Sequence, residues 1–224
     1  TQCKPFLLAL MKAKRAGKLR QRDLLRALHT IENFHFVFNA VCSLRPSGIE
    51  GAYSKAARAI NAPQSTKVTN GEVVEQLCTL LSNRKPELTV FTENFRDLTF
   101  TDEKNKQKKL IQYILSKFEM SRHAGNEYRP HSITLEHVLP QSNGGGKEIG
   151  MIGNLIPLSK ELNEQAGDKP LERKISIYEQ SEFILTEEFV HELQTIYGGE
   201  WNSDNIINRT DRLAGEAYTS LWNH

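Results

Sequence analysis

The sequence contains few cysteines, and they are widely separated. Its 224 residues include only three, Cys3, Cys42 and Cys78, so it lacks any Cys-x-x-Cys pair of the kind that builds a zinc ribbon or knuckle. A sparse and odd number of cysteines is typical of reduced thiols rather than of a disulfide scaffold. We therefore expect neither structural zinc nor disulfide bonds, and a cytoplasmic location.

The sequence also lacks long apolar runs. The longest near-apolar stretch, from Phe6 to Met11, is far shorter than the ~20 apolar residues that a membrane-spanning helix requires. The first residues include neither an initiator methionine nor the layout of a signal peptide. These absences predict a fragment of a longer cytoplasmic protein that has no membrane partner.

An excess of charge of one sign is missing overall but present locally. Lys and Arg number 29 against 27 Asp and Glu, which gives a formal net charge of +2. Residues 1–26, however, hold eight basic residues and a single acid, Asp23, so they carry +7 and the other 198 residues carry −5. Such asymmetry is typical of a chain with one end facing a nucleic acid or a membrane surface.

A second basic run contains Lys106, Lys108 and Lys109. Together with the basic N-terminal helix, these lysines could follow a DNA backbone through counterion release. A charge run is also commonly no more than the solvated face of a helix. Both interpretations stay open at this point.

Helical periodicity dominates the first half of the sequence. Apolar residues near multiples of 3.6 predict one helix over about residues 22–42, and shorter patterns predict helices over 53–60, 73–81 and 110–118. Near the C-terminus the same spacing predicts another helix, whose apolar stripe is Ile207, Thr210, Ala214, Ala217 and Leu221.

The pattern changes after Pro130. Residues 131–138 alternate and are β-branched, and residues 154–158 form a second short apolar run, so each predicts a strand. The glycines at 144–146 predict a loop between the strands, and Ser159 is the expected N-cap of a following helix. A strand–strand–helix unit within a helical protein is where we expect the chemistry to lie.

Four polar residues stand out in that unit. Glu136 and His137 end the first strand, Asn154 opens the second strand, and Asn163 lies in the following helix. Carboxylate and amide oxygens suit Mg²⁺ or Mn²⁺, with water and phosphate oxygens completing the coordination. A neutral histidine beside the metal can accept a proton from an attacking water. The pattern predicts a one-metal site for phosphodiester hydrolysis.

The sequence resembles a known family over these same stretches. Residues 135–140 (Leu-Glu-His-Val-Leu-Pro), residues 153–159 (Gly-Asn-Leu-Ile-Pro-Leu-Ser) and Leu162-Asn163 resemble the ββα-metal (HNH) nuclease motif in its His-Asn-Asn form. More narrowly, the chain is similar to the C-terminal nuclease half of GmrSD-like modification-dependent restriction and anti-phage proteins, SspE-like proteins included. Residues 113–115 and 170–174 and the segment from Trp201 to Trp222 also fit that family's pattern.

The resemblance implies a role for each residue. His137 would be the general base, Glu136 and Asn163 would bind the metal, and Asn154 would support catalysis by holding the loop between the strands. Many relatives have Asp in place of Glu136. His131 and Lys174 could contact the nucleic acid, although a packed histidine and a solvated lysine are the alternatives. Trp201 and Trp222 are expected to pack the C-terminal helices.

The fold implied is α+β and mostly α-helical, a helical bundle with an embedded ββα-metal (HNH) module. We expect an N-terminal helical region over 1–125, the module over 126–185 and a C-terminal helical cap packed on it over 186–224. The family's nucleotide-binding and modification-sensing motif is missing from this sequence. That N-terminal domain is therefore an expected partner outside this fragment.

The sequence and the resemblance together predict a Mg²⁺- or Mn²⁺-dependent endonuclease that acts on double-stranded DNA in the prokaryotic cytoplasm. A single site would cut one strand per encounter, so nicking is expected, and a dimer would be needed for double-strand breaks. Two alternatives stay open. One is an RNA-directed or nonspecific nuclease toxin, and the other is a catalytically silent DNA-binding or assembly module with a vestigial HNH fold.

Overall fold

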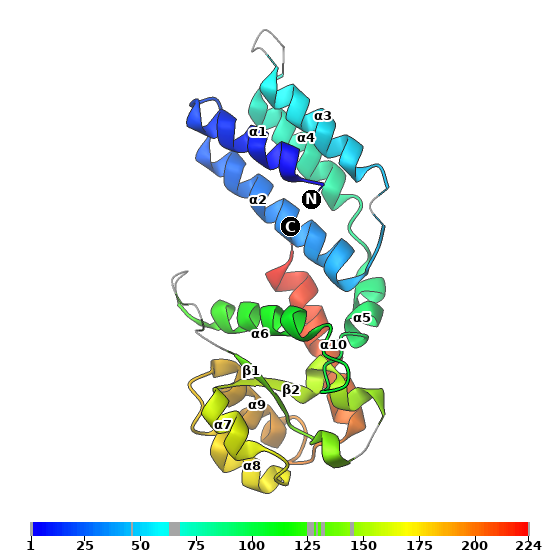
Figure 1. Cartoon of the computed structure of the whole chain (residues 1–224), viewed down its shortest axis with the longest axis vertical. Coiled ribbons are helices and arrows are strands. Elements are labelled where there is room, and N and C mark those ends of the chain that lie inside the picture. Colours follow the sequence, from blue (N-terminus) through cyan, green and yellow to red (C-terminus); the bar gives the residue numbers. More distant parts are fainter. Residues whose placement is uncertain are drawn as a thin grey trace. The chain divides into compact units, whose positions relative to one another are not determined.

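The protein is mainly helical and contains one small sheet (Figure 1). The computed structural model describes residues 2–45, 47–62, 68–124, 128, 130, 133–143 and 146–223. It divides into two compact units, one formed by Thr1–Glu87 with Trp222–His224 and the other by Leu88–Leu221. Helices with a single two-stranded sheet confirm the predicted α+β, mostly α-helical class, while the three-part domain layout stays a prediction.

The first unit is built from four helices, α1 (Lys4–Arg15), α2 (Gln21–His35), α3 (Ile49–Asn61) and α4 (Asn70–Ser82). Helix α1 packs on α3, α2 packs on α4, and α3 also contacts α4. Their apolar faces share one core. Helix α2 runs directly into a π-helical turn, Phe36–Val41, so the long helix predicted over 22–42 is confirmed in extent. Leu28, one of the apolar residues whose spacing predicts this helix, is nevertheless 37% exposed.

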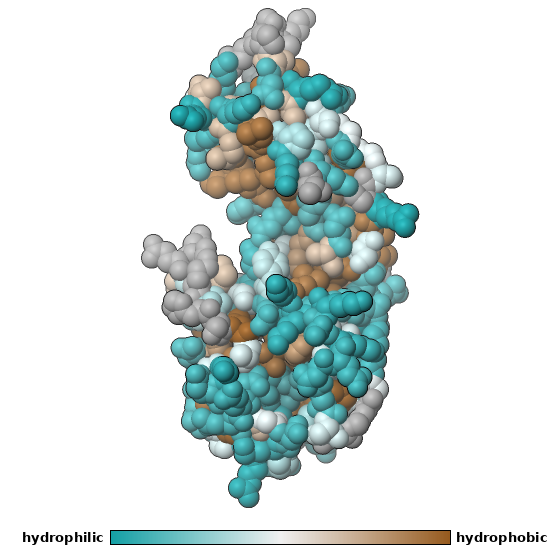
Figure 2. Space-filling view, in the orientation of Figure 1, coloured by the Kyte–Doolittle hydropathy of each residue, from teal (hydrophilic) through white to brown (hydrophobic). Residues whose placement is uncertain are grey.

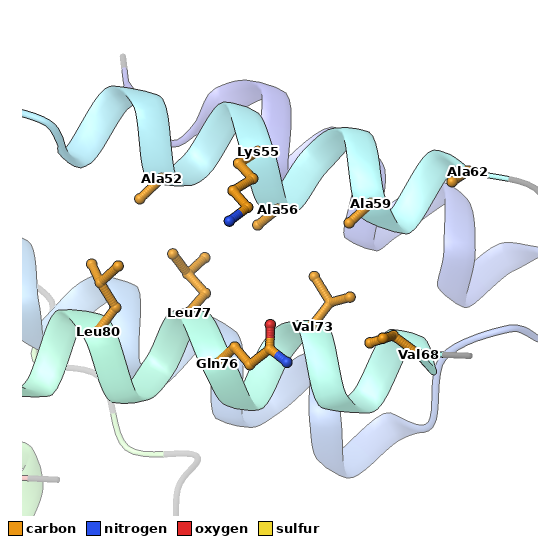
Figure 3. Close-up of a pocket in the computed structure, with 10 residues that line it drawn as sticks. All are labelled: Ala52, Lys55, Ala56, Ala59, Ala62, Val68, Val73, Gln76, Leu77 and Leu80. Carbon is orange, nitrogen blue, oxygen red and sulfur yellow. The ribbon is translucent and has the colours of Figure 1, made fainter. Parts of the chain in front are cut away.

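Small side chains leave a groove between two helices of this unit. Alanines of α3, among them Ala52 and Ala56, face Val73 and Leu77 of α4 across a space of ≈ 340 Å³ (Figure 3). Lys55 and Gln76 also line this groove (Figure 3). The groove is therefore apolar along its floor and contains none of the residues predicted to carry chemistry.

The last residues of the chain belong to the first unit. The Trp222 ring is buried and stacks on Phe36, with ring centroids 3.6 Å apart and planes inclined by 12°. Its carbonyl oxygen accepts a hydrogen bond from Lys85 Nζ at 2.8 Å. Trp222 thus packs in a different unit from Trp201, whose ring contacts Phe189 in the second unit. The expected packing on the C-terminal helices is confirmed for Trp201 and wrong for Trp222.

The second unit surrounds its sheet with six helices. They are α5 (Leu88–Arg96), α6 (Lys108–Arg122), α7 (Lys160–Ala166), α8 (Leu171–Tyr178), α9 (Ile184–Thr195) and α10 (Ser203–Glu216). Hydrophilic residues cover most of its visible face (Figure 2). Among the described residues, no helix of either unit is long and apolar enough to cross a membrane.

The two strands form an antiparallel pair, and a helix follows directly. Strand β1 (Thr134–His137) pairs with β2 (Leu155–Leu158), so that Thr134 lies opposite Leu158 and His137 opposite Leu155. Helix α7 begins at once, because Ser159 Oγ accepts a hydrogen bond from the Leu162 N–H at 3.2 Å. Both predicted strands and the predicted cap are confirmed, with different bounds: β1 covers 134–137 of the expected 131–138, of which residues 131 and 132 lie outside the described residues, and β2 begins one residue later than expected.

Helix α10 fixes the segment that leads into β2. Arg209 is buried, stacks its guanidinium on Phe189, and donates hydrogen bonds to the carbonyl oxygens of Gly153 (2.8 Å) and Leu155 (3.1 Å). Burial lowers the pKa of Arg209 to about 10. The buried stripe of α10 includes Ile206, whereas Ile207 is 37% exposed, so the predicted stripe begins one residue too late.

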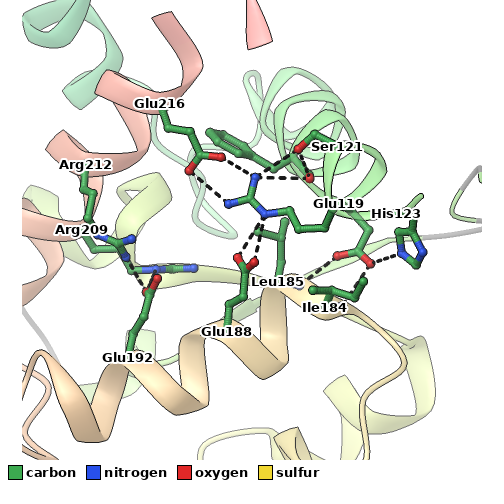
Figure 4. A network of polar contacts seen from close by, with 12 residues as sticks. Glu119, Ser121, His123, Ile184, Leu185, Glu188, Glu192, Arg209, Arg212 and Glu216 are labelled. Carbon is green, nitrogen blue, oxygen red and sulfur yellow. Dashed lines mark hydrogen bonds and ion pairs between the residues drawn. The ribbon is translucent and has the colours of Figure 1, made fainter. Parts of the chain in front are cut away.

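Polar contacts tie α6 to the helices that follow the sheet (Figure 4). The buried carboxylate of Glu119 accepts hydrogen bonds from the N–H groups of Ile184 and Leu185, both at 3.0 Å, and so satisfies donors at the start of α9. Arg122 forms ion pairs with Glu188 of α9 and Glu216 of α10. Helix α6, which precedes β1, is thereby held against the C-terminal helices.

Gly153 provides a test of this packing. A Cβ atom at residue 153 would overlap the Ile206 carbonyl oxygen and Thr210 Oγ1, so we expect Gly153→Ala to lower the free energy of unfolding by at least about 2 kcal/mol. At Gly215, within α10, an added Cβ would meet nothing within 4 Å. Gly215→Ala should instead stabilise by about 0.5–1 kcal/mol. Urea unfolding measures both, and equal effects would contradict the packing described.

Candidate active site

Three of the four polar residues singled out in the strand–strand–helix unit line one cavity. Glu136, His137 and Asn163 all contribute to a hollow of ≈ 360 Å³ in the second unit. Strand β1 supplies the first two residues and α7 supplies the third. The fourth residue, Asn154, does not line it. The strand–strand–helix unit therefore brings together the groups expected to act on substrate.

A backbone carbonyl fixes the protonation of His137. Its Nε2 lies 2.9 Å from the carbonyl oxygen of Phe100, which can only accept a hydrogen bond, so Nε2 carries the proton and Nδ1 presents a lone pair. The Phe100 and His137 rings stack with centroids 5.4 Å apart. The carbonyl is itself held in place, because the Phe100 N–H donates to Gly150 O at 2.8 Å.

The unprotonated Nδ1 of His137 faces a part of the cavity lined by two further polar residues, Gln141 and Asp102. Gln141 Nε2 is 3.4 Å from His137 Nδ1, and the Gln141 side chain also accepts a hydrogen bond from the Asp102 N–H at 3.0 Å. Burial lowers the pKa of His137, while the Phe100 hydrogen bond and the negative charge of Asp102 partly counter it. The ring is therefore neutral near pH 7, as a general base must be.

Glu136 is buried and has one oxygen engaged. Its Oε1 accepts hydrogen bonds from Lys174 Nζ at 2.6 Å and from the Tyr178 hydroxyl at 2.8 Å. Its Oε2 accepts none from the part of the chain that the structure describes. Burial raises the pKa of Glu136, against the opposing effect of Lys174 and Tyr178. One carboxylate oxygen is thus fixed by the protein, and the other lacks a hydrogen-bond donor among the described residues.

Lys174 does not lie where a nucleic-acid contact requires it. The side chain is 1% exposed, and besides Glu136 its ammonium contacts the His137 carbonyl oxygen at 2.7 Å. An ammonium held by these two acceptors inside the protein is out of reach of a phosphate at the surface. The proposed DNA contact of Lys174 is corrected to the partner of Glu136.

Asn163 is oriented by the strand beneath it. Its Nδ2 donates to Thr134 Oγ1 at 2.9 Å, and that hydroxyl donates to Leu158 O at 2.8 Å. No described residue donates a hydrogen bond to Asn163 Oδ1. The amide therefore presents an oxygen that is free to bind a hard cation such as Mg²⁺.

Asn154 is committed to holding the backbone. Its Oδ1 accepts from the Leu139 N–H (2.9 Å) and Trp201 Nε1 (3.0 Å), and its Nδ2 donates to the carbonyl oxygens of Leu139 (2.9 Å) and Ile149 (2.8 Å). The residue is fully buried. These contacts join the end of β1 to the turn before β2, which fits a supporting role and leaves no group for substrate.

The predicted nucleic-acid contacts lie differently with respect to the cavity. Lys108 lines it and places its ammonium 4.9 Å from the centre of the Phe100 ring. Lys106 and Lys109 are exposed but do not line it. His131 lies outside the described residues.

Sequence reasoning missed several residues at this site. Asp168, at the end of α7, lines the cavity, and its charge adds to the raised pKa of Glu136. Gln141 also lines it, while Tyr178 bonds Glu136 from α8. Among these residues only Asp168 had a local sequence feature that could have drawn attention to it, namely the glycine before it that ends α7. Phe100 could not be found from the sequence, because it contacts His137 through its backbone carbonyl, which every residue type has.

The cavity fits a small divalent cation. The described residues contain no group of three or more His, Cys, Asp or Glu side chains placed to hold a metal, but a site for Mg²⁺ needs only one or two carboxylates together with water. The free oxygens of Glu136 and Asn163 line the same hollow. They match the hard donors that such an ion prefers.

Comparison with known families identifies the domain that contains this cavity. The family model described as GmrSD restriction endonucleases, C-terminal domain, matches residues 88–216. The chain belongs to this family. The match covers more than half of the chain and begins at the first residue of the second unit. A search of curated proteins found no match.

Membership of the GmrSD family establishes the kind of protein to which this domain belongs. The chain carries the C-terminal domain of a restriction endonuclease family, so it is a nuclease domain and DNA is the substrate that the family implies. The first unit lies outside the matched residues.

The buried position of Lys174 predicts a large effect on stability. Lys174→Met leaves the Glu136 carboxylate buried without its cation, and we expect it to lower the free energy of unfolding by about 3–5 kcal/mol. Adding Glu136→Gln should recover a large part of that loss, as a double-mutant cycle can measure. Arg173→Gln, at the exposed neighbouring residue, should change stability by less than about 0.5 kcal/mol. A neutral Lys174→Met would contradict the buried pair.

The environment of His137 predicts its titration in the metal-free protein. Burial should place the NMR titration midpoint of its ring below the ordinary histidine value of ~6.5. Because the charge of Asp102 raises the pKa of His137, Asp102→Asn should move the midpoint lower still. The control Asp97→Asn removes one negative charge from a residue outside the cavity. It should leave the titration midpoint of His137 unchanged. A midpoint above the ordinary value would show that the ring is not buried as described.

Proposed function

We propose that the second unit is a ββα-metal (HNH-type) endonuclease that hydrolyses DNA phosphodiester bonds with Mg²⁺ or Mn²⁺. One observation carries the proposal. The cavity combines a histidine whose unprotonated Nδ1 has only the Gln141 amide, at 3.4 Å, as a hydrogen-bond partner among the described residues with two oxygen donors, from Glu136 and Asn163. A base and a pair of hard ligands in one hollow are the groups that metal-assisted hydrolysis needs.

His137 acts as the general base. Its Nδ1 takes a proton from a water molecule that attacks the phosphorus atom, and its Nε2–H stays bonded to the Phe100 carbonyl oxygen throughout. The ring becomes positively charged in this step. Asp102, whose charge favours the protonated ring, stabilises that form. Gln141, beside Nδ1, is placed to orient the water.

Glu136 and Asn163 would hold the metal through their side-chain oxygens. Lys174 and Tyr178 orient the Glu136 carboxylate by binding its other oxygen, and Thr134 orients the Asn163 amide. A bound Mg²⁺ or Mn²⁺ ion supplies a Lewis acid that stabilises negative charge on the leaving 3′ oxygen. Cleavage then leaves a 5′ phosphate.

The rim of the cavity carries positive charge for the substrate. Lys108 begins α6 and Lys160 begins α7, and both line the hollow. We expect their ammonium groups to contact phosphates flanking the cleaved bond, although that of Lys160 also lies 3.7 Å from Glu164. Lys106, just before α6, and Lys109 would extend the contact. A single site of this kind cuts one strand per encounter. The activity we propose is therefore nicking, as the effector of a restriction or anti-phage protein whose sensing domain is separate.

A supercoiled-plasmid assay tests this proposal. Wild type should convert plasmid to open circles in Mg²⁺ or Mn²⁺ and not in EDTA. His137→Ala should reduce the rate by about 10²–10⁴-fold because the base acts in the transition state. Asn163→Ala should weaken metal binding, and raised metal should partly restore its rate. His191→Ala, at an exposed histidine of α9, is the matched control and should cut normally.

Two results would count against the proposal. If His137→Ala and Asn163→Ala respond alike to a metal titration, the assignment of base and ligand is wrong. If wild type binds DNA equally with and without metal, and cuts in neither case even as part of the full-length protein, the unit is a vestigial binding module.

A further inference from the structure

The two units carry opposite net charge. Residues 1–87 contain 14 basic and 6 acidic residues, a net charge of +8, which leaves −6 for residues 88–224. The half that contains the nuclease site therefore repels a polyanion overall, apart from the lysines at its rim. The first unit, which lies outside the family match, holds the attractive charge.

The positive charge of the first unit is concentrated at one turn. The last turns of α1, the loop 16–20 and the first turn of α2 form a basic tip, whose cationic members are Lys12, Lys14, Arg15, Lys18, Arg20 and Arg22. Asp23 is the only acid among residues 1–26. Hydrophilic side chains occupy this end of the unit (Figures 1 and 2).

The loop of the basic tip is held in one conformation. Gly17 adopts a positive φ of 69°, which lets the chain reverse directly after α1. The Lys18 N–H donates to Ala13 O at 2.8 Å, the Lys18 carbonyl accepts from Asn70 Nδ2 at 3.0 Å, and Leu19 is buried. The cations thus extend from a fixed support, so that few backbone degrees of freedom are lost on binding.

Four cations of the basic tip have no acidic partner in the part of the chain that the structure describes. Arg20 contacts Asp23 at 2.8 Å, and Arg22 lies 3.6 Å from the same carboxylate. Lys12, Lys14, Arg15 and Lys18 form no ion pair with a described residue. All of them are exposed except Lys14, which is partly buried. Their charge is not neutralised inside the protein and is available to an external anion.

We propose that the basic tip binds the sugar–phosphate backbone of double-stranded DNA, without reading its sequence, and so holds the duplex for the nuclease unit. The inference rests on the proposed function, which makes DNA the polyanion that this chain must bind. B-DNA carries one negative charge per ~1.7 Å of its axis, so several cations on one turn meet several phosphates at once. Each contact releases condensed counterions, and a second point of attachment raises the local concentration of substrate.

DNA binding by the whole chain in EDTA, where no cleavage occurs, tests the tip. The tip variant combines Lys12→Gln, Arg15→Gln and Lys18→Gln. The matched control combines Arg45→Gln, Lys55→Gln and Arg58→Gln, which removes three exposed charges from the same unit. Fluorescence anisotropy with a 20-base-pair duplex over a range of salt gives the affinity and its salt dependence. Circular dichroism and thermal unfolding should be unchanged in both variants.

The tip variant should lose at least about tenfold in affinity at 0.1 M salt, and the slope of log K against log salt should fall by about 3, or ~0.9 for each lost phosphate contact. The control should lose less than one unit of slope. Plasmid cleavage in Mg²⁺ should show a raised KM for the tip variant and an unchanged kcat.

Three outcomes would overturn the tip assignment. They are equal losses in the two variants, wild-type affinity in the tip variant, and tip-dependent binding of phosphatidylserine vesicles with unchanged binding of DNA. Each of these leaves the nuclease proposal standing if metal-dependent nicking persists. Loss of nicking in wild type, with tip-dependent DNA binding intact, would refute the nuclease and retain the tip.

Discussion

The site depends on the buried contact between Lys174 and Glu136. A carboxylate at 4% exposure loses the water that would stabilise its charge. The Lys174 ammonium and the Tyr178 hydroxyl, both from α8, replace that water on one oxygen. The same ammonium also donates a hydrogen bond to the carbonyl oxygen of His137. One cation therefore orients the proposed metal ligand and fixes the backbone of the proposed base, and α8 is as necessary to the site as the strand that carries it.

The base is prepared by a part of the chain that precedes the strand–strand–helix unit. The Phe100 carbonyl lies 37 residues before His137, in the segment between α5 and α6, and Gly150 holds it from the connection between the strands. Removing the His137 ring from water favours its neutral form. The hydrogen bond to the Phe100 carbonyl sets the tautomer in which Nδ1 carries no proton. Both effects come from placement alone. A minimal strand–strand–helix fragment would contain His137 without the environment that makes its Nδ1 a usable base.

Local patterns therefore predicted the residue types of the site but not their environment. Alternation at 134–137 and the Ser159 cap were visible because both depend on neighbours within a few residues. Lys174 could not be placed, since a lysine on a short helix looks the same whether its stem lies on the surface or crosses the core to reach a carboxylate. Ile206 and Ile207 were likewise interchangeable by composition, and only the packing of α10 against the turn at Gly153 decides which is buried. Trp222 shows the same limit over a longer range, because its partner Phe36 is remote in sequence.

The unequal distribution of charge follows from the chemistry proposed for the cavity. Holding a divalent cation calls for carboxylates, and Asp102, Glu164 and Asp168 line the hollow along with Glu136. Such a site repels the phosphates on which it acts until the metal is bound, and two rim lysines offset only part of that repulsion. Further positive charge must then be supplied elsewhere in the chain. At physiological ionic strength its influence fades over about 8 Å, so cations in the first unit cannot simply attract DNA from a distance. They contribute only by touching the backbone, which is why an exposed, rigid turn with unpaired cations is better suited to this task than the same charge spread over the surface.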